Sequence, residues 1–232
     1  MIRQYAEIPM PTRPSDPTPL EMAIYNYELK AREFHNTKNA EVSLDETTED
    51  KAKRLLQRDQ DWNHLKLERR KIAIQARQQE QLEKYRSENR EKSIKELSQE
   101  AHHPTKKLAK NLLAVGEPKP TTIHEPHHII PGKGRHLKML MVQCRLNLHA
   151  YGIGINDPTN GIWLRNFAKN KPSDWATPDS PSHRPLHTHK YEQWIADFFS
   201  NDNLPESVFT KRLSKVKRDL KNGTHPSNIL NT

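Results

Sequence analysis

The sequence of 232 residues lacks the features of several protein classes. Its single cysteine, Cys144, excludes an intrachain disulfide framework. It has no run of about 18 apolar residues, so we expect no membrane-spanning helix. The first twenty residues contain neither a continuous apolar stretch nor a small-residue cleavage site, and we therefore expect no Sec signal peptide. Because only 33% of the residues are hydrophobic, we expect a small domain with exposed or helical extensions.

Glycine and net charge are both confined to the second half of the chain. All seven glycines follow position 115. Residues 1–103 contain 19 Lys and Arg against 19 Asp and Glu, whereas residues 104–232 contain 19 against 10, so the second half carries the whole formal excess of +9. A basic module of this kind attracts polyanions, of which nucleic acid is the commonest, although a basic surface can also serve solubility alone.

The first half divides by its proline content. Five prolines fall within residues 1–19, which predicts an extended arm. Residues 20–103 contain neither proline nor glycine and are rich in Lys, Arg, Glu, Gln, Leu and Ala, which predicts one long charged helix or a helical hairpin. Its apolar stripe is too thin to indicate a coiled coil. Two interpretations stay open: a solvated helix with i,i+4 ion pairs, or a docking and delivery segment.

From Pro104 the texture changes, and we expect a folded domain over residues 104–204 followed by a basic helix and tail over 205–232. The stretch KKLAKNLLAVGEPKP predicts a short helix that ends at Gly116. The remaining pattern predicts strands at 124–130 and 161–166 and helices at 138–148, after Pro185 and at 206–222.

Histidine is concentrated in two clusters of this second half. His127 and His128 are adjacent in an expected strand, so their side chains point to opposite faces and only one of them can join a given metal site. His183 and His187 are one helical turn apart and could share an ion. Three imidazoles would leave coordination positions open, as in a catalytic metal site. Between the clusters, Asn160 precedes a glycine, which fits a simple turn as well as a catalytic role.

A histidine pair, an asparagine and a second histidine pair within about sixty residues resemble the AHH nucleases of the HNH/endonuclease VII group, which occur mostly as bacterial toxin domains. The segments HEPHHIIPGKGRH, GIGINDPTNGIWLRN and HRPLHTHKYEQWI carry the resemblance, over about residues 105–200. Pro126 stands where the family has the alanine of its name. The resemblance implies an α+β fold with a small ββα-metal (His-Me finger) core and flanking helices, preceded here by the charged helical region.

The same resemblance implies the residue roles. His127, His183 and His187 would bind one divalent ion, Mg²⁺, Mn²⁺, Zn²⁺ or Ni²⁺, and His128 would be the general base. Asn160 would bond the backbone near His128 and hold its ring. The literal string Ala101–His103 lacks a strand after it and a lead-in helix before it, so we interpret it as a helix terminus outside the site.

Several basic residues are candidates for binding the nucleic-acid backbone, although each could equally be a surface charge. They are Arg135, Arg145 and Arg165, as an additional phosphate clamp, and Lys211, Arg212 and Lys215 on the C-terminal helix.

These observations predict a metal-dependent endonuclease that cuts DNA, an antibacterial effector made in the producer cytoplasm and exported without a Sec signal, for example by a type VI system, into a target cytoplasm. We expect an acidic immunity protein as one partner. We expect the first half to engage a secretion component or chaperone, and a fragment from Pro104 onward to fold and cut alone. The alternatives are an RNase with the same finger, or a noncatalytic nucleic-acid-binding or structural protein with a structural zinc site.

Overall fold

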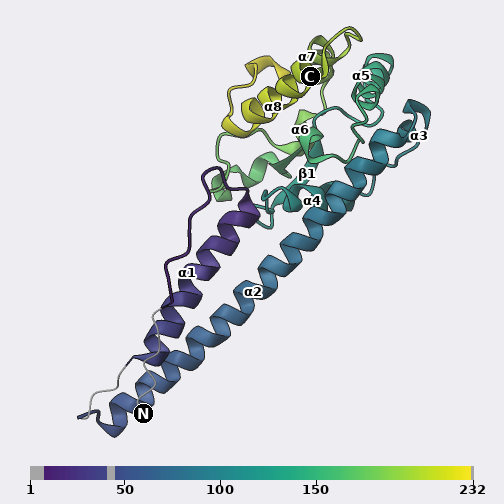
Figure 1. Ribbon diagram of the computed structural model, residues 1–232. Helices are drawn as coiled ribbons and strands as arrows, with labels where there is room; N and C mark the ends of the chain where they lie inside the picture. Colours follow the sequence, from purple (N-terminus) through teal and green to yellow (C-terminus); the bar gives the residue numbers. More distant parts are fainter. Residues whose placement is uncertain (1–7, 41–44, 231–232) are drawn as a thin grey trace. The chain divides into compact units, whose positions relative to one another are not determined.

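The computed structural model describes residues 8–40 and 45–230, and the chain divides into two compact units, residues 1–77 and 78–232. Helix α2 (Thr48–Glu91) runs through the boundary between them. The described chain is mostly helical and contains one two-stranded antiparallel sheet, so it belongs to the α+β class (Figure 1). Within the described residues, none of the helices has the length and apolar character needed to cross a membrane.

The first unit begins with irregular chain and a well-capped helix. Residues 8–18 form neither helix nor strand, and the first seven residues of the predicted arm lie outside the described residues. Helix α1 spans Pro19–Asn39, so Pro19 starts the helix instead of ending the arm. The Thr18 side chain accepts a hydrogen bond from the Glu21 amide at 3.3 Å, and the Glu21 carboxylate accepts one from the Thr18 amide at 2.8 Å. This capping box fixes the start of α1.

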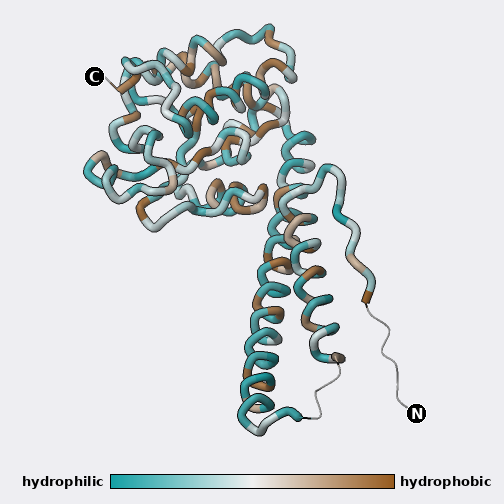
Figure 2. The backbone as a smooth tube through the Cα atoms, turned by 90° about the vertical axis from the view of Figure 1, so that its left-hand side faces the viewer, coloured by the Kyte–Doolittle hydropathy of each residue, from teal (hydrophilic) through white to brown (hydrophobic). Residues whose placement is uncertain are grey.

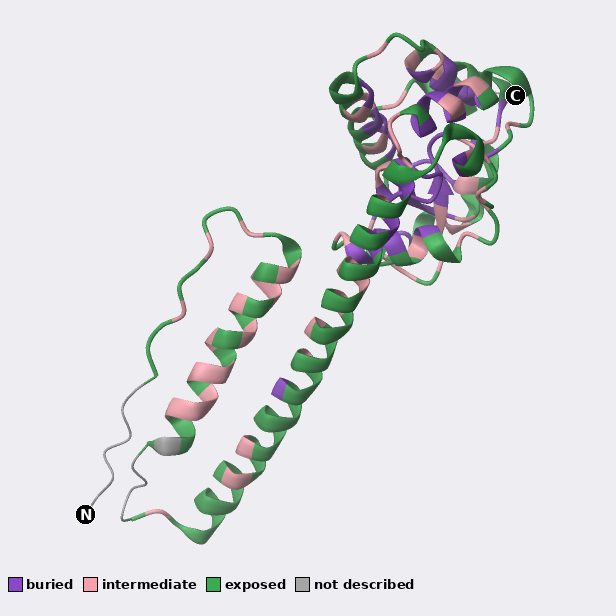
Figure 3. Ribbon diagram, turned by 45° about the vertical axis from the view of Figure 1, so that its right-hand side comes forward, coloured by how far each residue is buried: buried purple, intermediate pink, exposed green. Residues whose placement is uncertain are grey.

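Helix α1 packs against the N-terminal part of α2 through a few contacts. The rings of Phe34 and Trp62 stack with their centroids 5.5 Å apart, and the Lys30 ammonium lies 3.8 Å from the Glu68 carboxylate. Most of α2 is exposed, with isolated apolar residues among hydrophilic ones (Figures 2 and 3). Leu65 is a buried exception. The first unit therefore has only a thin apolar interior.

The second unit contains all of the sheet and the nine described helical segments after α2. In chain order these elements are α3 (Ile94–Ser98), α4 (Lys106–Ala114), β1 (His124–His128), α5 (Lys138–Ala150), η1 (Pro158–Asn160), β2 (Gly161–Arg165), η2 (Ala168–Ser173), α6 (His183–Leu186), α7 (His189–Phe199), α8 (Glu206–Asn222) and η3 (Ser227–Leu230).

The sheet consists of β1 and β2 paired antiparallel over five residues each. In this register His127 lies opposite Ile162 and His128 lies opposite Gly161. All five residues of β2 are buried, and α4, α8 and η2 pack against this strand. The sheet thus holds the histidine pair in the interior of the unit.

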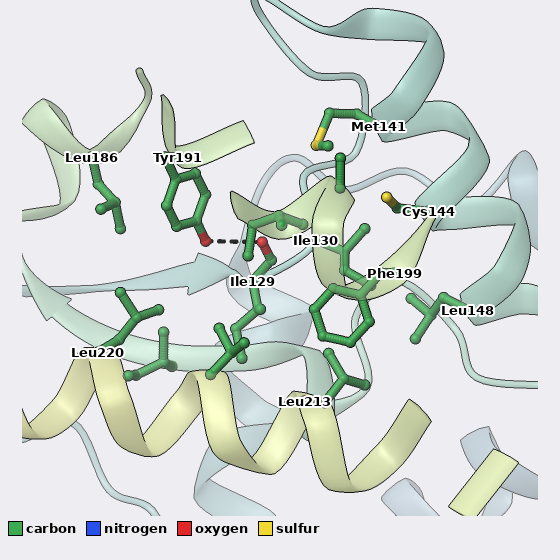
Figure 4. Close-up of a cluster of buried hydrophobic side chains, with 14 of the residues drawn as sticks. Ile129, Ile130, Met141, Cys144, Leu148, Leu186, Tyr191, Phe199, Leu213 and Leu220 are labelled. Carbon is green, nitrogen blue, oxygen red and sulfur yellow. Dashed lines mark hydrogen bonds between the residues drawn. The ribbon is translucent and has the colours of Figure 1, made fainter. Parts of the chain in front are cut away.

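The main core surrounds the end of β1 (Figure 4). Ile129 and Ile130, directly after the strand, are fully buried. Side chains from α5, α7 and α8 pack around them, including Met141, Leu148, Tyr191, Phe199, Leu213 and Leu220. Cys144 is buried in the same core, and burial raises the pKa of its thiol to about 12, so it acts as a small apolar filler.

Helix α8 has the bounds that the sequence predicts. Pro205 precedes its first turn, and Gly223 ends it in the left-handed conformation, with φ of 69°. Its apolar residues Phe209, Leu213, Val216 and Leu220 recur every three or four positions and are all buried. The burial of this single face, about 25 cal/mol for each Å² of apolar surface, fixes α8 on the domain.

The compact second unit starts earlier than the predicted domain start at residue 104. Its first residue is Gln78, and Leu82, Tyr85 and Leu97 are buried in it. The Arg86 guanidinium donates two hydrogen bonds to the Asp157 carboxylate, at 2.7 and 3.0 Å. The end of α2 and all of α3 therefore belong to the folded domain, which composition alone did not indicate.

Candidate metal centre and active site

Three histidine side chains from two separate parts of the chain converge. His127 lies on β1, His183 is the first residue of α6, and His187 directly follows α6. The ring centroids of His127 lie 5.0 Å from those of His183 and 5.2 Å from those of His187, and one nitrogen of each ring lies within 4.8 Å of the others. The structure thus brings together the three predicted metal ligands.

The hydrogen bonds of His127 determine which of its nitrogens is free. The Tyr191 hydroxyl donates to the Ile129 carbonyl at 2.9 Å (Figure 4). That hydroxyl lies 2.9 Å from Nε2 of His127, so it accepts from an Nε2–H group. Nδ1 is then left with a lone pair, and among the described residues it has no hydrogen-bond partner although it is buried. A buried imidazole nitrogen that keeps its lone pair and has no hydrogen-bond partner fits the role of a metal ligand.

His183 is oriented in a similar way by an acidic neighbour. Its Nδ1 lies 2.9 Å from the Glu125 carboxylate, which can only accept, so Nδ1 carries the proton and Nε2 is free. Burial opposes ionisation of Glu125, but the hydrogen bond from His183 and the charge of Arg184 hold the pKa of this carboxyl below its ordinary value. A carboxylate behind the ring makes the imidazole a better ligand.

Burial keeps these imidazoles neutral. It lowers the pKa of His127 well below its ordinary value, with further lowering by the neighbouring histidines. It also lowers the pKa of His187 to about 4, assisted by His183 and Arg135. Neutral imidazole is the form that binds metal, so at neutral pH the three ligands need lose no proton.

His128 points away from this cluster, as adjacent residues of a strand must. It is 7% exposed, and burial lowers its pKa to about 4. Its Nε2 lies 3.1 Å from Oδ1 of Asn156. The ring is therefore neutral at neutral pH, and it is held in place without being one of the converging ligands.

Asn160 braces the chain that follows β1. Its Oδ1 accepts from the Ile130 amide at 2.8 Å, and its backbone carbonyl accepts from the Ile129 amide at 2.9 Å. Its Nδ2 donates to the carbonyls of Ile155 and Ile130. Asn160 thus bonds the backbone next to His128, as the resemblance implies, but the ring of His128 is bonded by Asn156 instead.

All these histidines line one pocket, and the string at residues 101–103 reaches it too. The pocket histidines are His102, His103, His127, His128, His183 and His187. The ring of His102 lies 6.2 Å from that of His128, and a Cβ at Gly132 would meet the His102 ring at 2.3 Å. Our interpretation of Ala101–His103 as a helix terminus outside the site is wrong: α3 ends at Ser98, and the irregular chain after it lies along the pocket.

A protein-family model matches the part of the chain that contains these histidines. The model of AHH, a nuclease family of the HNH/ENDO VII superfamily with conserved AHH, matches residues 108–225, half of the chain. The chain belongs to the AHH nuclease family. No curated protein and no solved structure matches it. The matched region contains His127 and His128 of β1 but not Ala101–His103.

Membership makes this chain a hydrolytic nuclease of the HNH/ENDO VII superfamily, with nucleic acid as its substrate. Members of this superfamily typically use a divalent metal, and the cluster of three histidines can hold one.

Two of the three predicted arginines are interior braces of this AHH nuclease, which corrects the proposed phosphate clamp. Arg145 is 8% exposed and donates to the carbonyls of Gly132, Ser98 and Glu100 at 2.8–2.9 Å. Arg165 is 3% exposed and donates to the Asp174 carboxylate at 2.9 Å and to the Ser182 hydroxyl at 3.0 Å. With their donors committed to buried acceptors, both hold pocket loops in place. Arg165 does so for the segment directly before His183.

Arg135 remains exposed and lines the histidine pocket. The loop that carries it is held by Glu192 of α7, a buried carboxylate that the sequence did not single out. Glu192 accepts hydrogen bonds from the backbone amides of Arg135, of His136 at 2.9 Å and of Leu137 at 2.5 Å.

The three predicted basic residues of α8 do not line the histidine pocket. Lys211 is exposed. Arg212 donates to the Phe198 carbonyl at 2.7 Å, and Lys215 pairs with Asp219 at 2.5 Å.

Proposed function

We propose that this AHH nuclease is a metal-dependent endonuclease that hydrolyses phosphodiester bonds of DNA. One observation carries the proposal: three converging histidines with free nitrogens share a pocket with a fourth, buried histidine that is not among them. A purely structural metal site closes its coordination with four protein ligands and has no use for such a neighbour.

The order of the elements supports a ββα-metal finger as the core of the fold. Strands β1 and β2 with the helical segment α6 and α7 would form the ββα-metal finger, since β1 supplies His127 and the turns around α6 supply His183 and His187. The charged helices α1 and α2 would form the region that precedes it, for docking or delivery.

The ligand set favours some metals over others. Three imidazoles suit Zn²⁺ or Ni²⁺ better than Mn²⁺ or Mg²⁺, which prefer oxygen ligands. A divalent ion held by His127, His183 and His187 would supply a Lewis acid for the charge that develops on the phosphate and the leaving oxygen.

His128 would supply the base. Its neutral ring accepts a proton from water, whose oxygen forms a bond to phosphorus as the bond from phosphorus to the leaving oxygen breaks. Arg135 at the pocket would neutralise a phosphate of the bound strand, and the formal excess of +9 in the second half would favour its approach.

Cleavage assays with the purified full chain test this function. We expect cleavage of plasmid DNA that EDTA stops and that Zn²⁺ or Ni²⁺ restores more fully than Mn²⁺ or Mg²⁺. His128→Ala should lower the rate by about 10²–10⁴-fold and leave metal affinity unchanged, whereas His127→Ala should abolish metal binding. His225→Ala, outside the pocket, is the matched control and should change neither.

Other results would contradict the proposal in distinct ways. Cleavage of structured RNA but not of plasmid would make the protein an RNase. Tight metal binding without cleavage of either substrate would indicate a noncatalytic protein with a structural site. A His128→Ala variant that loses metal as His127→Ala does would reverse the roles within the pair.

We also propose the biological setting: an antibacterial effector made in the producer cytoplasm, exported for example by a type VI system, and neutralised by an acidic immunity protein. The supports are the family resemblance and the basic second half, which an acidic partner would complement. A secretion component or chaperone would bind the first unit. If so, expression inside bacteria stops growth, His128→Ala does not, and an acidic partner that restores growth covers the histidine pocket.

A further inference from the structure

The side-chain amide of Asn156 is fully buried, and both its nitrogen and its oxygen have hydrogen-bond partners. Its Nδ2 donates to Oε1 of Glu100 at 3.1 Å and to the Ala101 carbonyl at 3.0 Å, which uses both amide hydrogens. Its Oδ1 can therefore only accept from Nε2 of His128, 3.1 Å away. This contact requires the proton of the neutral His128 ring to sit on Nε2, which leaves Nδ1 as the nitrogen that can take a proton.

Glu100 is itself fixed from two helices. The Tyr85 hydroxyl of α2 donates to its Oε2 at 2.8 Å, and the Lys107 ammonium of α4 donates to its Oε1 at 2.7 Å. Burial opposes its ionisation, but these hydrogen bonds and the one from Asn156 hold the pKa of the Glu100 carboxyl below its ordinary value. An ionised carboxylate accepts more strongly than a neutral group, so it orients the Asn156 amide firmly.

The loop before Asn156 fits closely against this carboxylate. A Cβ on Gly154 would lie 2.0 Å from the Tyr85 hydroxyl and 2.8 Å from Oε2 of Glu100. The Asn156 carbonyl also accepts from Nδ2 of Asn111 at 2.8 Å. Backbone and side chain of Asn156 are thus both held. The side chain is held by Glu100, which Tyr85 bonds in turn, and both of these residues lie upstream of the region 108–225 that matches the family.

We propose that Asn156 and Glu100 are positioning residues for His128, and that they select the tautomer in which Nδ1 accepts the proton from water. The inference rests on the proposed function and adds to it a chain of hydrogen bonds from the end of α2 to the base. Asn160, the asparagine that the sequence resemblance assigns to this role, braces the backbone, whereas Asn156 bonds the ring.

The first test needs no substitution. Nitrogen-15 NMR of the zinc-loaded full chain at neutral pH should show the His128 ring as the Nε2–H tautomer. In Asn156→Ala we expect that preference to be lost and kcat to fall by about 10–100-fold, with KM and zinc affinity within about twofold of the unsubstituted chain. A ring with its proton on Nδ1 in the unsubstituted chain would overturn the proposal.

A paired exchange guards against a merely structural effect. Asn156→Asp places a second carboxylate against Glu100 and should lower kcat. Adding Glu100→Gln turns the facing group into a donor and should recover most of that loss. No recovery in a folded double variant would count against the proposal.

Asn147 provides the matched control, since it is also a buried asparagine, with Nδ2 donating to the Phe199 carbonyl at 2.8 Å. Asn147→Ala should cost stability but leave the His128 tautomer and kcat unchanged at temperatures where it is folded. The same loss of tautomer preference in Asn147→Ala would overturn the proposal. A chain that cuts no nucleic acid would refute the proposed function, whereas the NMR measurement would still decide the positioning of His128.

Discussion

At the scale of single residues, the neighbour of each histidine decides which nitrogen is available. The Tyr191 hydroxyl accepts a hydrogen bond from Nε2–H of His127, and the Glu125 carboxylate accepts one from Nδ1–H of His183. These partners lie 64 and 58 residues away in the sequence, so no local pattern points to them. The three candidate metal ligands could be predicted from the spacing of the histidines in the sequence. The groups that bond the other nitrogen of His127 and His183, and so orient these rings, could be identified only from the fold.

Tyr191→Phe tests this role of a hydroxyl. It removes the group that accepts from His127 and that donates to Ile129, so metal affinity should fall by about 10–100-fold. The free energy of unfolding without metal should fall by about 1–3 kcal/mol, because a buried carbonyl loses its donor. Calorimetric metal titration and chemical denaturation measure the two effects.

Tyr151→Phe is the control for Tyr191→Phe, since it loses a comparable hydrogen bond, to the Leu204 carbonyl, away from the histidines. It should lower stability and leave metal affinity unchanged. Equal metal affinity in both variants would mean that Tyr191 has no part in orienting His127.

The buried histidines also predict how metal-free stability depends on pH. Burial lowers the pKa of His128 and His187 to about 4, and lowers that of His127 in the same direction. Below about pH 6.5 these histidines bind protons in the unfolded chain but stay neutral in the folded chain. The free energy of unfolding is therefore highest above that pH and falls as the pH drops. Each such histidine contributes a slope of up to about 1.4 kcal/mol per pH unit.

Denaturation in EDTA at pH values from 7.5 to about 5, above the range where carboxylates titrate, measures this slope. His128→Gln should make this slope shallower, because glutamine binds no proton in either the folded or the unfolded state. A free energy of unfolding that stays constant over this range would show that the histidine rings are accessible to protons in the folded chain.

At the scale of helices and strands, the sequence locates elements best where proline and glycine mark their ends. Helix α8 lies between Pro205 and Gly223 and has the predicted bounds, and the predicted strand at 161–166 is β2 (Gly161–Arg165). The strand predicted at 124–130 ends at His128, because the amides of Ile129 and Ile130 turn to Asn160. An asparagine side chain that replaces a strand partner leaves no mark in a hydrophobic pattern.

Charged residues were the least predictable part of the elements. Arg145 and Arg165 look like surface charges in the sequence, yet both are buried because carbonyls and an aspartate from distant loops surround them. The carboxylate of Glu192 in α7 similarly accepts hydrogen bonds from the backbone amides of residues 135–137. Interior polar networks of this kind depend on several groups at once, so residue type and spacing alone do not reveal them.

At the scale of the whole molecule, the division of the chain differs from the division of its composition. Charge and glycine change at about residue 104, but the compact second unit begins at Gln78. The last turns of α2 are as polar as its earlier ones, and only Leu82 and Tyr85 there are buried apolar residues. A helix that supplies few buried side chains to a domain looks, in composition, like the solvated helix that continues from it.

Two truncated chains test whether the folded domain begins at Gln78 or at Pro104. A fragment of residues 78–232 should fold and keep the cleavage rate of the full chain. A fragment of residues 104–232 lacks both acceptors of the Asn156 amide group, the arginine that pairs with Asp157 and two of the acceptors of Arg145. Breaking the ion pair between Arg86 and the buried Asp157 carboxylate should cost about 3–5 kcal/mol. The two lost acceptors of the buried Arg145 add to this cost, so the shorter fragment should be largely unfolded or inactive.

Chemical denaturation and single-turnover cleavage of the two fragments measure this difference. If residues 104–232 matched residues 78–232 in both measurements, the end of α2 and α3 would be dispensable, and the boundary at Pro104 would stand. If instead the shorter fragment regained its cleavage rate when a peptide of residues 78–103 was added, the loss would lie in the missing contacts and not in irreversible misfolding. That outcome would make residues 78–103 part of the enzyme itself, which the polar composition of this segment conceals.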